Sequence, residues 1–312
     1  MSGFNNVRSD IPQLEAYHDG RHVLADSPFS RESIPYVVVL PDEGVVANSY
    51  TWVDRQGQAG GIFFLFGPGV EGGSIVELFD TVAVSPDQNF DDWKVGGLHF
   101  RQDLALQHAD VAVRGKRASI EFQFDAVHPA YAYGFHPDGC PSYIADNRTE
   151  QTGRVKGVLE IDNRRIPFDT TGVRDHSWGT RDWKIPQHWK WMHAQAGPDV
   201  AVHIFQIQAL GRVETRGYVL RDGLFSEARS AEFDFTTTDR YFHATLSCTI
   251  RDSMDRTTRL EGACFGHHAF LPNPDTTLNQ GAMTCTIEGK AGSGYVEFLW
   301  PTEYLKHIGN RE

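Results

Sequence analysis

The residue types best suited to acid–base chemistry are concentrated in residues 172–193, which read GVRDHSWGTRDWKIPQHWKWMH and contain four of the seven tryptophans. A carboxyl group enclosed by indole rings loses hydration, so its pKa rises and it can donate a proton near neutral pH. Asp175 or His176 is therefore the candidate general acid–base group. The faces of Trp178 and Trp183 would stabilise a cationic intermediate. This set suits protonation of a C=C bond, followed by capture of water or by loss of a proton.

The same stretch also suits a purely structural role. Arg–Asp pairs and buried Trp often connect two domains, and perturbed charges occur in such networks as well. Composition alone favours this structural brace over an active site. On a strand, Asp175 and Ser177 would share one face and His176 and Trp178 the other, so Asp175 and His176 are not automatically a dyad. Gly179 permits a bend that a bulkier residue would resist.

A second cluster follows in WKWMHAQAGPDVAVHIFQI, where Trp189, Trp191 and His193 share one face of a predicted strand. A three-residue GPD turn would place His193 opposite His203, whereas a two-residue turn would place it opposite Ile204. A His pair could bind a ligand, relay a proton or hold a metal. Ordinary inward aromatics with a hydrogen-bonded His are the favoured interpretation. We predict no metal, because no third ligand occurs at a familiar spacing.

A Pro- and Gly-rich segment, HPAYAYGFHPDGCPSY at residues 128–143, predicts a long loop. Its aromatic residues Tyr131, Tyr133 and Phe135 alternate with small ones. They could line an apolar ligand channel, although simple packing under the loop is the favoured interpretation.

Bulk composition restricts the partners of the chain. With a formal charge of −12 over 312 residues, a nucleic-acid partner or a strongly anionic membrane surface is disfavoured. We find no run of about 18 apolar residues and no secretory signal pattern, so we expect no stable membrane insertion. Four scattered cysteines without a CxxC pair predict reduced thiols and a cytoplasmic protein. The sequence leaves a homodimer open.

Strand-like runs separated by Gly, Pro, Asp and Asn occur on both sides of residues 172–193, which predicts an all-β protein with two antiparallel barrels. One of these runs, RVKGVLEIDNRRIPFD, is interpreted as a hairpin that turns at Asn163–Arg164. We predict an N-terminal arm at residues 1–30, a first barrel domain at 31–183 and a second at 184–312. Their meeting surface is a usual place for a ligand pocket.

The stretch EQTGRVKGVLEIDNRRIPFDTTGVRDHSWGTRDW, residues 150–183, resembles a segment shared by carotenoid 1,2-hydratase (hydroxyneurosporene synthase), kievitone hydratase and the AttH-like proteins. The resemblance implies two lipocalin-like, calycin-type barrels and a pocket for a hydrophobic ligand, with His176 and Trp178 near it. It also implies cofactor-independent addition of water to a C=C bond, or a related dehydration, isomerisation or cyclisation. Asp175 and Arg181 match the motif and carry over as site residues.

The favoured function is therefore a hydratase, dehydratase or isomerase that acts on a hydrophobic substrate of the isoprenoid, polyene, steroid or aromatic kind without a cofactor. The predicted catalytic residues are Asp175, His176 and His193. The predicted substrate-binding residues are Trp178, Arg181, Trp183, Trp191, His203 and Tyr133. The alternatives are a non-catalytic carrier of lipids or isoprenoids, and an interaction protein that docks a partner on an exposed Trp-rich face.

Overall fold

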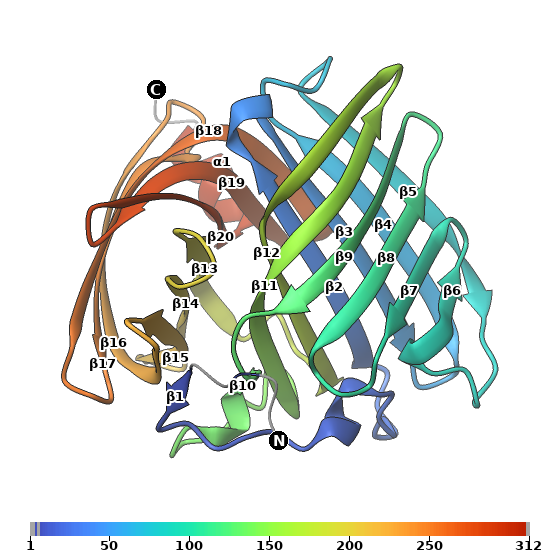
Figure 1. Ribbon diagram of the computed structural model, residues 1–312, viewed down its shortest axis with the longest axis horizontal. Helices are drawn as coiled ribbons and strands as arrows, with labels where there is room; N and C mark the ends of the chain where they lie inside the picture. The colour runs from blue at the N-terminus through green and yellow to red at the C-terminus, as the bar shows by residue number, and fades with distance from the viewer. Residues whose placement is uncertain (1–3, 5–6, 310–312) are drawn as a thin grey trace.

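Alternating side chains determine the strands of the first sheet. In β9 (Ala118–Ala126), Ile120, Phe122 and Phe124 are buried, while the residues between them are exposed or partly exposed. This period of two places one face of the strand on a core and the other in water. The computed structural model describes residues 4 and 7–309 of the chain (Figure 1).

The first sheet is antiparallel and curls into a nearly closed barrel (Figure 1). Its strand order is β5 (Ser74–Ala83), β4 (Gln58–Phe66), β3 (Val45–Asp54), β2 (Ser30–Leu40), β12 (Arg164–Thr180), β11 (Asn147–Ile161), β9, β8 (His108–Arg114), β7 (Leu98–Gln102) and β6 (Trp93–Val95), with β10 (Tyr131–Ala132) paired to β11.

The second sheet closes fully, because β16 pairs with β17 as well as with β15. Its strand order is β1 (Arg8–Ser9), β16 (Leu224–Thr237), β15 (Arg212–Arg221), β14 (Ala201–Ala209), β13 (Pro186–Gln195), β20 (Lys290–Pro301), β19 (Thr276–Ile287), β18 (Thr257–Asn273) and β17 (His243–Asp252). The described helices are short: η1 (Ala16–Asp19), η2 (Pro41–Glu43), η3 (Phe90–Asp92), η4 (Tyr133–Phe135) and α1 (Thr302–Gly309). The predicted all-β class with two antiparallel barrels is confirmed.

Three apolar cores result from this arrangement. One consists only of residues from the first barrel and another only of residues from the second. The third draws on both barrels and fills their junction, where Val37, Val173, Trp191 and Phe205 contribute. Strand β2 serves two cores, because Ile34 faces the first barrel and Val37 faces the junction. The last residues of its sequence SRESIPYVVVL form a continuous apolar run. This is expected of a strand that is buried on both faces.

The N-terminal segment crosses from one barrel to the other. β1 pairs in parallel with β16 of the second barrel, whereas η1 lies against the first, where Asp19 forms an ion pair with Arg174 of β12. Residues 1–3 and 5–6 of the predicted arm lie outside the described residues. The predicted division between residues 183 and 184 falls in the connection between β12 and β13 and remains a prediction. Among the described residues, no helix is long and apolar enough to cross a membrane.

Candidate active site

A cavity of about 290 Å³ lies at the junction of the two barrels. Strands of both sheets contribute to its wall, which is rich in aromatic rings and also contains charged groups. The aromatic residues are Tyr50, Trp52, Phe64, Trp183, Trp189, Trp191, Phe205, Phe270 and Tyr295, and the charged residues are Arg31, Arg148, Asp175, Arg181 and Glu297. An apolar hollow with a few convergent polar groups is the typical form of a small-molecule site.

One guanidinium in this wall is shared by two carboxyl groups. Arg148 donates from Nε to Glu150 Oε1 at 2.6 Å and from Nη2 to Asp175 Oδ2 at 2.7 Å. Glu150 lies directly opposite Asp175 in the β11–β12 ladder, so both side chains point to the same face. Both are almost fully removed from water, with side-chain exposures of 0% and 6%. Burial of two neighbouring carboxyl groups against one shared guanidinium favours a proton on one of them.

Asp175 is the group that retains it. Burial raises the pKa of Asp175 to about 8, and the attraction of Arg148 offsets this only in part, since the charge of Glu150 raises the pKa further. Its only hydrogen bond among the described side chains is the one from Arg148. Near neutral pH, Asp175 is therefore a carboxylic acid in the wall of an aromatic cavity.

Glu150 is held ionised by a dense set of donors. Its Oε1 accepts hydrogen bonds from the Tyr133 hydroxyl at 3.0 Å and from Trp191 Nε1 at 2.9 Å, and its Oε2 pairs with His193 Nε2 at 2.9 Å. His203 also lies next to Tyr133, with its Nε2 2.8 Å from the Tyr133 hydroxyl. Burial alone would raise the pKa of Glu150, but the guanidinium and the two imidazoles outweigh it and hold the pKa below its usual range.

His193 and His203 lie directly opposite each other in the β13–β14 ladder, with ring centroids 4.1 Å apart. Both are fully buried, and burial lowers the pKa of each imidazole. His203 Nδ1 donates to the Met192 carbonyl at 3.1 Å, which leaves Nε2 as an acceptor that competes with Glu150 Oε1 for the single hydroxyl proton of Tyr133. The two rings therefore lie behind Glu150 and position it, and neither faces the cavity.

A second carboxyl group with a raised pKa lies in the same wall. Glu297 of β20 lies opposite Trp191 in the β13–β20 ladder. It accepts hydrogen bonds from Gln280 Nε2 at 2.9 Å and Trp189 Nε1 at 3.2 Å. Burial raises the pKa of Glu297, and its charge contributes in turn to the raised pKa of Asp175. The cavity thus contains two carboxyl groups that influence each other's protonation.

Arg181 adds a cation to the polar side of the cavity. Its Nη2 donates to Ser177 Oγ at 3.0 Å and its Nη1 to Ser33 Oγ at 3.3 Å. Burial lowers the pKa of Arg181. These groups form a patch of hydrogen-bond donors suited to an oxygen atom of a ligand.

The other half of the motif faces away from the cavity, into the first barrel. His176 Nε2 lies 2.7 Å from Glu32 Oε1, and Trp178 stacks on His22 with centroids 3.7 Å apart. Gly179 ends this alternation with φ of 109°, and a Cβ there would lie 2.1 Å from a side-chain carbon of Asp146. The motif needs glycine at this position for both reasons.

The predicted site residues therefore fall into three groups. Those that line the cavity are Asp175, Arg181, Trp183 and Trp191. Those that surround Glu150 without lining the cavity are His193, His203 and Tyr133. Those on the opposite face of β12 are His176 and Trp178, which do not line the cavity. Their catalytic and binding roles remain predictions.

Sequence reasoning missed Arg148, Glu150 and Glu297. The sequence did contain a signal for Glu150. Counting equal numbers of residues away from the hairpin turn along both strands pairs Glu150 with Asp175. The turn lies at Asp162–Asn163, between the paired residues Ile161 and Arg164, one position before the predicted turn. For Glu297 the signal was a single acidic residue within the otherwise apolar strand run YVEFLW.

The fold is similar to several solved structures. An AttH-like protein from Nitrosomonas europaea has a TM-score of 0.61 at 14% identity, over 88% of this chain and 93% of that one. CghA with Sch210972 has a TM-score of 0.61 at 13% identity, over 88% and 89%. Kievitone hydratase from Nectria haematococca has a TM-score of 0.61 at 11% identity, over 95% and 96%. At the level of fold, the resemblance inferred from residues 150–183 is confirmed.

No curated protein sequence matches the chain. A family model does match: a domain of unknown function (DUF7064) covers residues 15–302. Since the match includes both barrels and every residue of the cavity wall, the chain belongs to the DUF7064 family.

Proposed function

We propose that this protein is a hydratase, dehydratase or isomerase that acts on a C=C bond of a hydrophobic substrate in the junction cavity, with Asp175 as the proton donor. The observation that carries the proposal is the Asp175 carboxyl, buried, tied to a shared guanidinium and raised in pKa to about 8. A group with a pKa near the working pH is an efficient general acid. The fold shared with kievitone hydratase agrees with this reaction class.

The size of the cavity restricts the substrate. About 290 Å³ lies at the lower end of the usual range for small-molecule sites, about 300–1,000 Å³. The substrate is therefore a compact apolar ring system, or the unsaturated end of a longer isoprenoid or polyene chain. The aromatic wall gives apolar contact over most of its surface, and Arg181 offers donors to one oxygen atom.

In the hydration direction, Asp175 transfers its proton to one carbon of the double bond, and a carbocation develops on the other. The faces of Trp183, Trp189 and Trp191 stabilise the cation through their π-electrons. Water adds to the cation, and the proton it loses passes to a carboxylate of the wall, for which Glu297 is placed. The reverse sequence is dehydration, and loss of a proton from a neighbouring carbon instead of water capture gives isomerisation. No electrons are gained or lost, so no redox cofactor enters the scheme.

The first experiment identifies a substrate. Native mass spectrometry of the purified chain tests for a co-purified apolar molecule, which then guides a panel of apolar alkenes and their hydrates. Incubation in H₂¹⁸O followed by mass spectrometry measures hydration as incorporated label. We expect ¹⁸O incorporation with at least one compound of the panel that also quenches tryptophan fluorescence of the cavity wall.

The decisive variant is Asp175→Asn, which keeps the shape of the side chain and removes the acid. Loss of a general acid costs about 10²–10⁴-fold in rate. We expect turnover to fall in that range while the ligand still quenches fluorescence with similar affinity. If Asp175→Asn turns over as the parent does, Asp175 is not the proton donor.

A carrier of hydrophobic ligands is the second candidate function, because the same cavity can hold a ligand without reaction. The outcome that favours it is a ligand that binds with quenching of the wall tryptophans but gains neither ¹⁸O nor deuterium over prolonged incubation. In that case Asp175→Asn would alter ligand affinity alone.

A further inference from the structure

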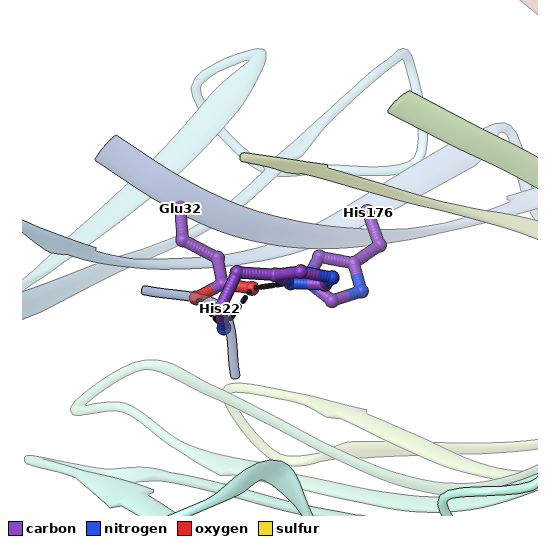
Figure 2. A group of neighbouring side chains, drawn as sticks. All are labelled: His22, Glu32 and His176. Atoms are coloured by element: carbon purple, nitrogen blue, oxygen red, sulfur yellow. Dashed lines mark hydrogen bonds and ion pairs between the residues drawn. The ribbon is translucent and has the colours of Figure 1, made fainter. Parts of the chain in front are cut away.

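A second constellation of polar groups lies on the opposite face of β12, inside the first barrel. Figure 2 shows His22, Glu32 and His176 converging, with Glu32 between the two imidazoles. Glu32 Oε1 lies 2.7 Å from His22 Nδ1 and 2.7 Å from His176 Nε2. One ligand atom from each of the three residues lies within 4.8 Å of the others. The junction cavity does not include any of the three.

Three separate parts of the chain bring these groups together. Glu32 and His176 project from the paired strands β2 and β12, with Glu32 directly opposite Trp178 and therefore diagonal to His176 on the same face. His22 comes from the segment between η1 and β2, where its backbone N–H also donates to Glu32 Oε2 at 3.0 Å. The cluster therefore consists of two residues from the sheet and one from the N-terminal segment.

The charge of Glu32 has no fixed counterion. Its side chain is 0% exposed, and among the described residues it forms ion pairs with the two histidines but with no Lys or Arg. A buried carboxylate requires a positive partner. Two imidazoles can supply one only by protonation, whereas a bound cation supplies it while both stay neutral.

We propose that His22, Glu32 and His176 bind one divalent transition-metal ion, with Zn²⁺ as the best fit. Two imidazole nitrogens and one carboxylate oxygen form a ligand set that Zn²⁺ prefers, with the fourth position open to water. Zn²⁺ bonds of about 2.0–2.2 Å place tetrahedral ligands roughly 3.3 Å apart. The present contacts of 2.7 Å therefore widen by about 0.6 Å when the ion enters, which side-chain rotation can provide.

His18 supplies the outer partner that a metal-bound histidine needs. A ligating imidazole almost always donates its other N–H to an acceptor. His22 directs Nδ1 to Glu32 and Nε2 to His18 Nδ1, at 2.9 Å. Trp178 stacks on both rings and orients them.

The second group of this composition, Glu150 with His193 and His203, differs in its counterion and in its access from solvent. Glu150 already has Arg148 as its counterion, and both of its oxygens accept hydrogen bonds. Its two histidines are fully buried, whereas the His22 side chain is 12% exposed and gives an ion a path from solvent. We therefore expect one bound ion per chain and not two.

The test uses the full chain without a histidine tag, stripped with a chelator and then titrated with Zn²⁺ alone by calorimetry. Co²⁺ serves as a second probe, because its visible absorption reports tetrahedral coordination. We expect one equivalent of each ion and a higher melting temperature in the metal-bound protein. Absence of stoichiometric binding by the stripped parent protein would overturn the proposal, and the three residues would then form a hydrogen-bonded brace.

Two ligand variants and a control complete the design. His22→Ala removes a partly exposed ligand, and Glu32→Gln removes the charge of the buried ligand but keeps its shape. Circular dichroism spectra check that both variants are folded, so that a loss of binding can be assigned to the missing ligand. Both variants should no longer bind one equivalent of Zn²⁺. His18→Ala should weaken Zn²⁺ binding by about 10–100-fold. His99→Ala removes a surface histidine paired with Asp92 and should change nothing. Unchanged binding by His22→Ala would place the ion elsewhere and sink the proposal.

Discussion

The two faces of β12 carry different chemistry from the same stretch of sequence. On one face, Asp175 and Ser177 line the junction cavity; on the other, Arg174, His176 and Trp178 face into the first barrel. Strand periodicity alone separates the two groups. The RDHSWGT motif therefore contributes side chains to two separate clusters, one on each face of β12.

The balance of charge is what distinguishes the two faces. Inside the barrel, Arg174 forms an ion pair with Asp19 at 3.2 Å and accounts for one buried carboxylate. At the cavity, Arg148 serves both Glu150 and Asp175. Burial is the largest cause of the raised pKa of Asp175, and the guanidinium that Asp175 shares with Glu150 offsets it only in part. The two aspartates therefore differ in their counterion, because Asp175 shares its guanidinium with a second carboxyl group.

The largest effect should follow from removing the shared cation. In Arg148→Met, Glu150 and Asp175 lose the guanidinium that contacts them both, and breaking a buried ion pair costs about 3–5 kcal/mol. Urea unfolding at pH 7 measures this loss. The variant Arg148→Met with Glu150→Gln and Asp175→Asn, which removes both carboxyl groups as well, should recover most of it.

Arg174→Met is the matched control on the other face. It should lose a similar amount of stability by leaving Asp19 unpaired, yet ligand affinity at the cavity should stay unchanged under conditions where the variant is folded. If Arg148→Met costs less than about 1 kcal/mol, the guanidinium is not the counterion of this pair.

The second effect is a dependence of stability on pH. The pKa of Asp175 is about 8 in the folded chain and 3.8 as the reference value for an unfolded chain. Between these values the folded state binds more protons, so the contribution of Asp175 to stability is present below pH 3.8 and declines as the pH rises to about 8. In Asp175→Asn, this pH-dependent loss of stability should be absent.

The free energy of unfolding of Asp175→Asn relative to the parent should therefore increase by about 2–3 kcal/mol between pH 6 and pH 8, at about 1.4 kcal/mol per pH unit. Urea unfolding at pH 6, 7, 8 and 9 checks the slope. Turnover of the parent should fall above pH about 8 as the acid ionises. A difference that is flat across this range would mean that Asp175 is ionised in the folded protein.

Much of the fold follows from the sequence, because each strand encodes its own pattern. The alternation in β9 and the unbroken apolar run of β2 predict one-sided and two-sided burial. The separation of Asp175 from His176 also follows from the period of two. What the sequence could not give is which face of β12 meets the cavity, because that depends on how two barrels pack.

The remaining errors come from register and from distance along the chain. A one-residue error at the turn of the β11–β12 hairpin displaces every partner, so the predicted turn would place Glu150 opposite Ser177 instead of Asp175. His22 and Glu32 escaped notice because no local spacing links them to His176, more than 140 residues away. Contacts of this kind depend on the three-dimensional arrangement and leave no periodic signal in the sequence.

A smaller effect tests the layer behind the cavity. Tyr133→Phe removes the hydroxyl between Glu150 and His203, so a charged acceptor loses one donor. We expect a loss of about 1.5–2 kcal/mol in the free energy of unfolding, because a hydrogen bond to a charged group contributes about that much. Zn²⁺ binding on the other face of β12 should not change. An unchanged unfolding curve would mean that the remaining donors of Glu150 suffice.

The smallest effect concerns the stacking that orients the proposed metal ligands. Trp178 lies 3.7 Å from His22, centroid to centroid, with the rings 5° from parallel. Trp178→Phe reduces the stacked area but keeps an aromatic ring, and aromatic pairs contribute about 0.5–1.5 kcal/mol beyond burial. Zn²⁺ affinity should accordingly fall by about 2–10-fold with the stoichiometry unchanged. Trp183→Phe is the counterpart in the cavity wall and should weaken only the apolar ligand. If Trp178→Phe instead affects the apolar ligand and spares Zn²⁺, the assignment of the two faces is reversed, because only a residue that faces the cavity can reach that ligand.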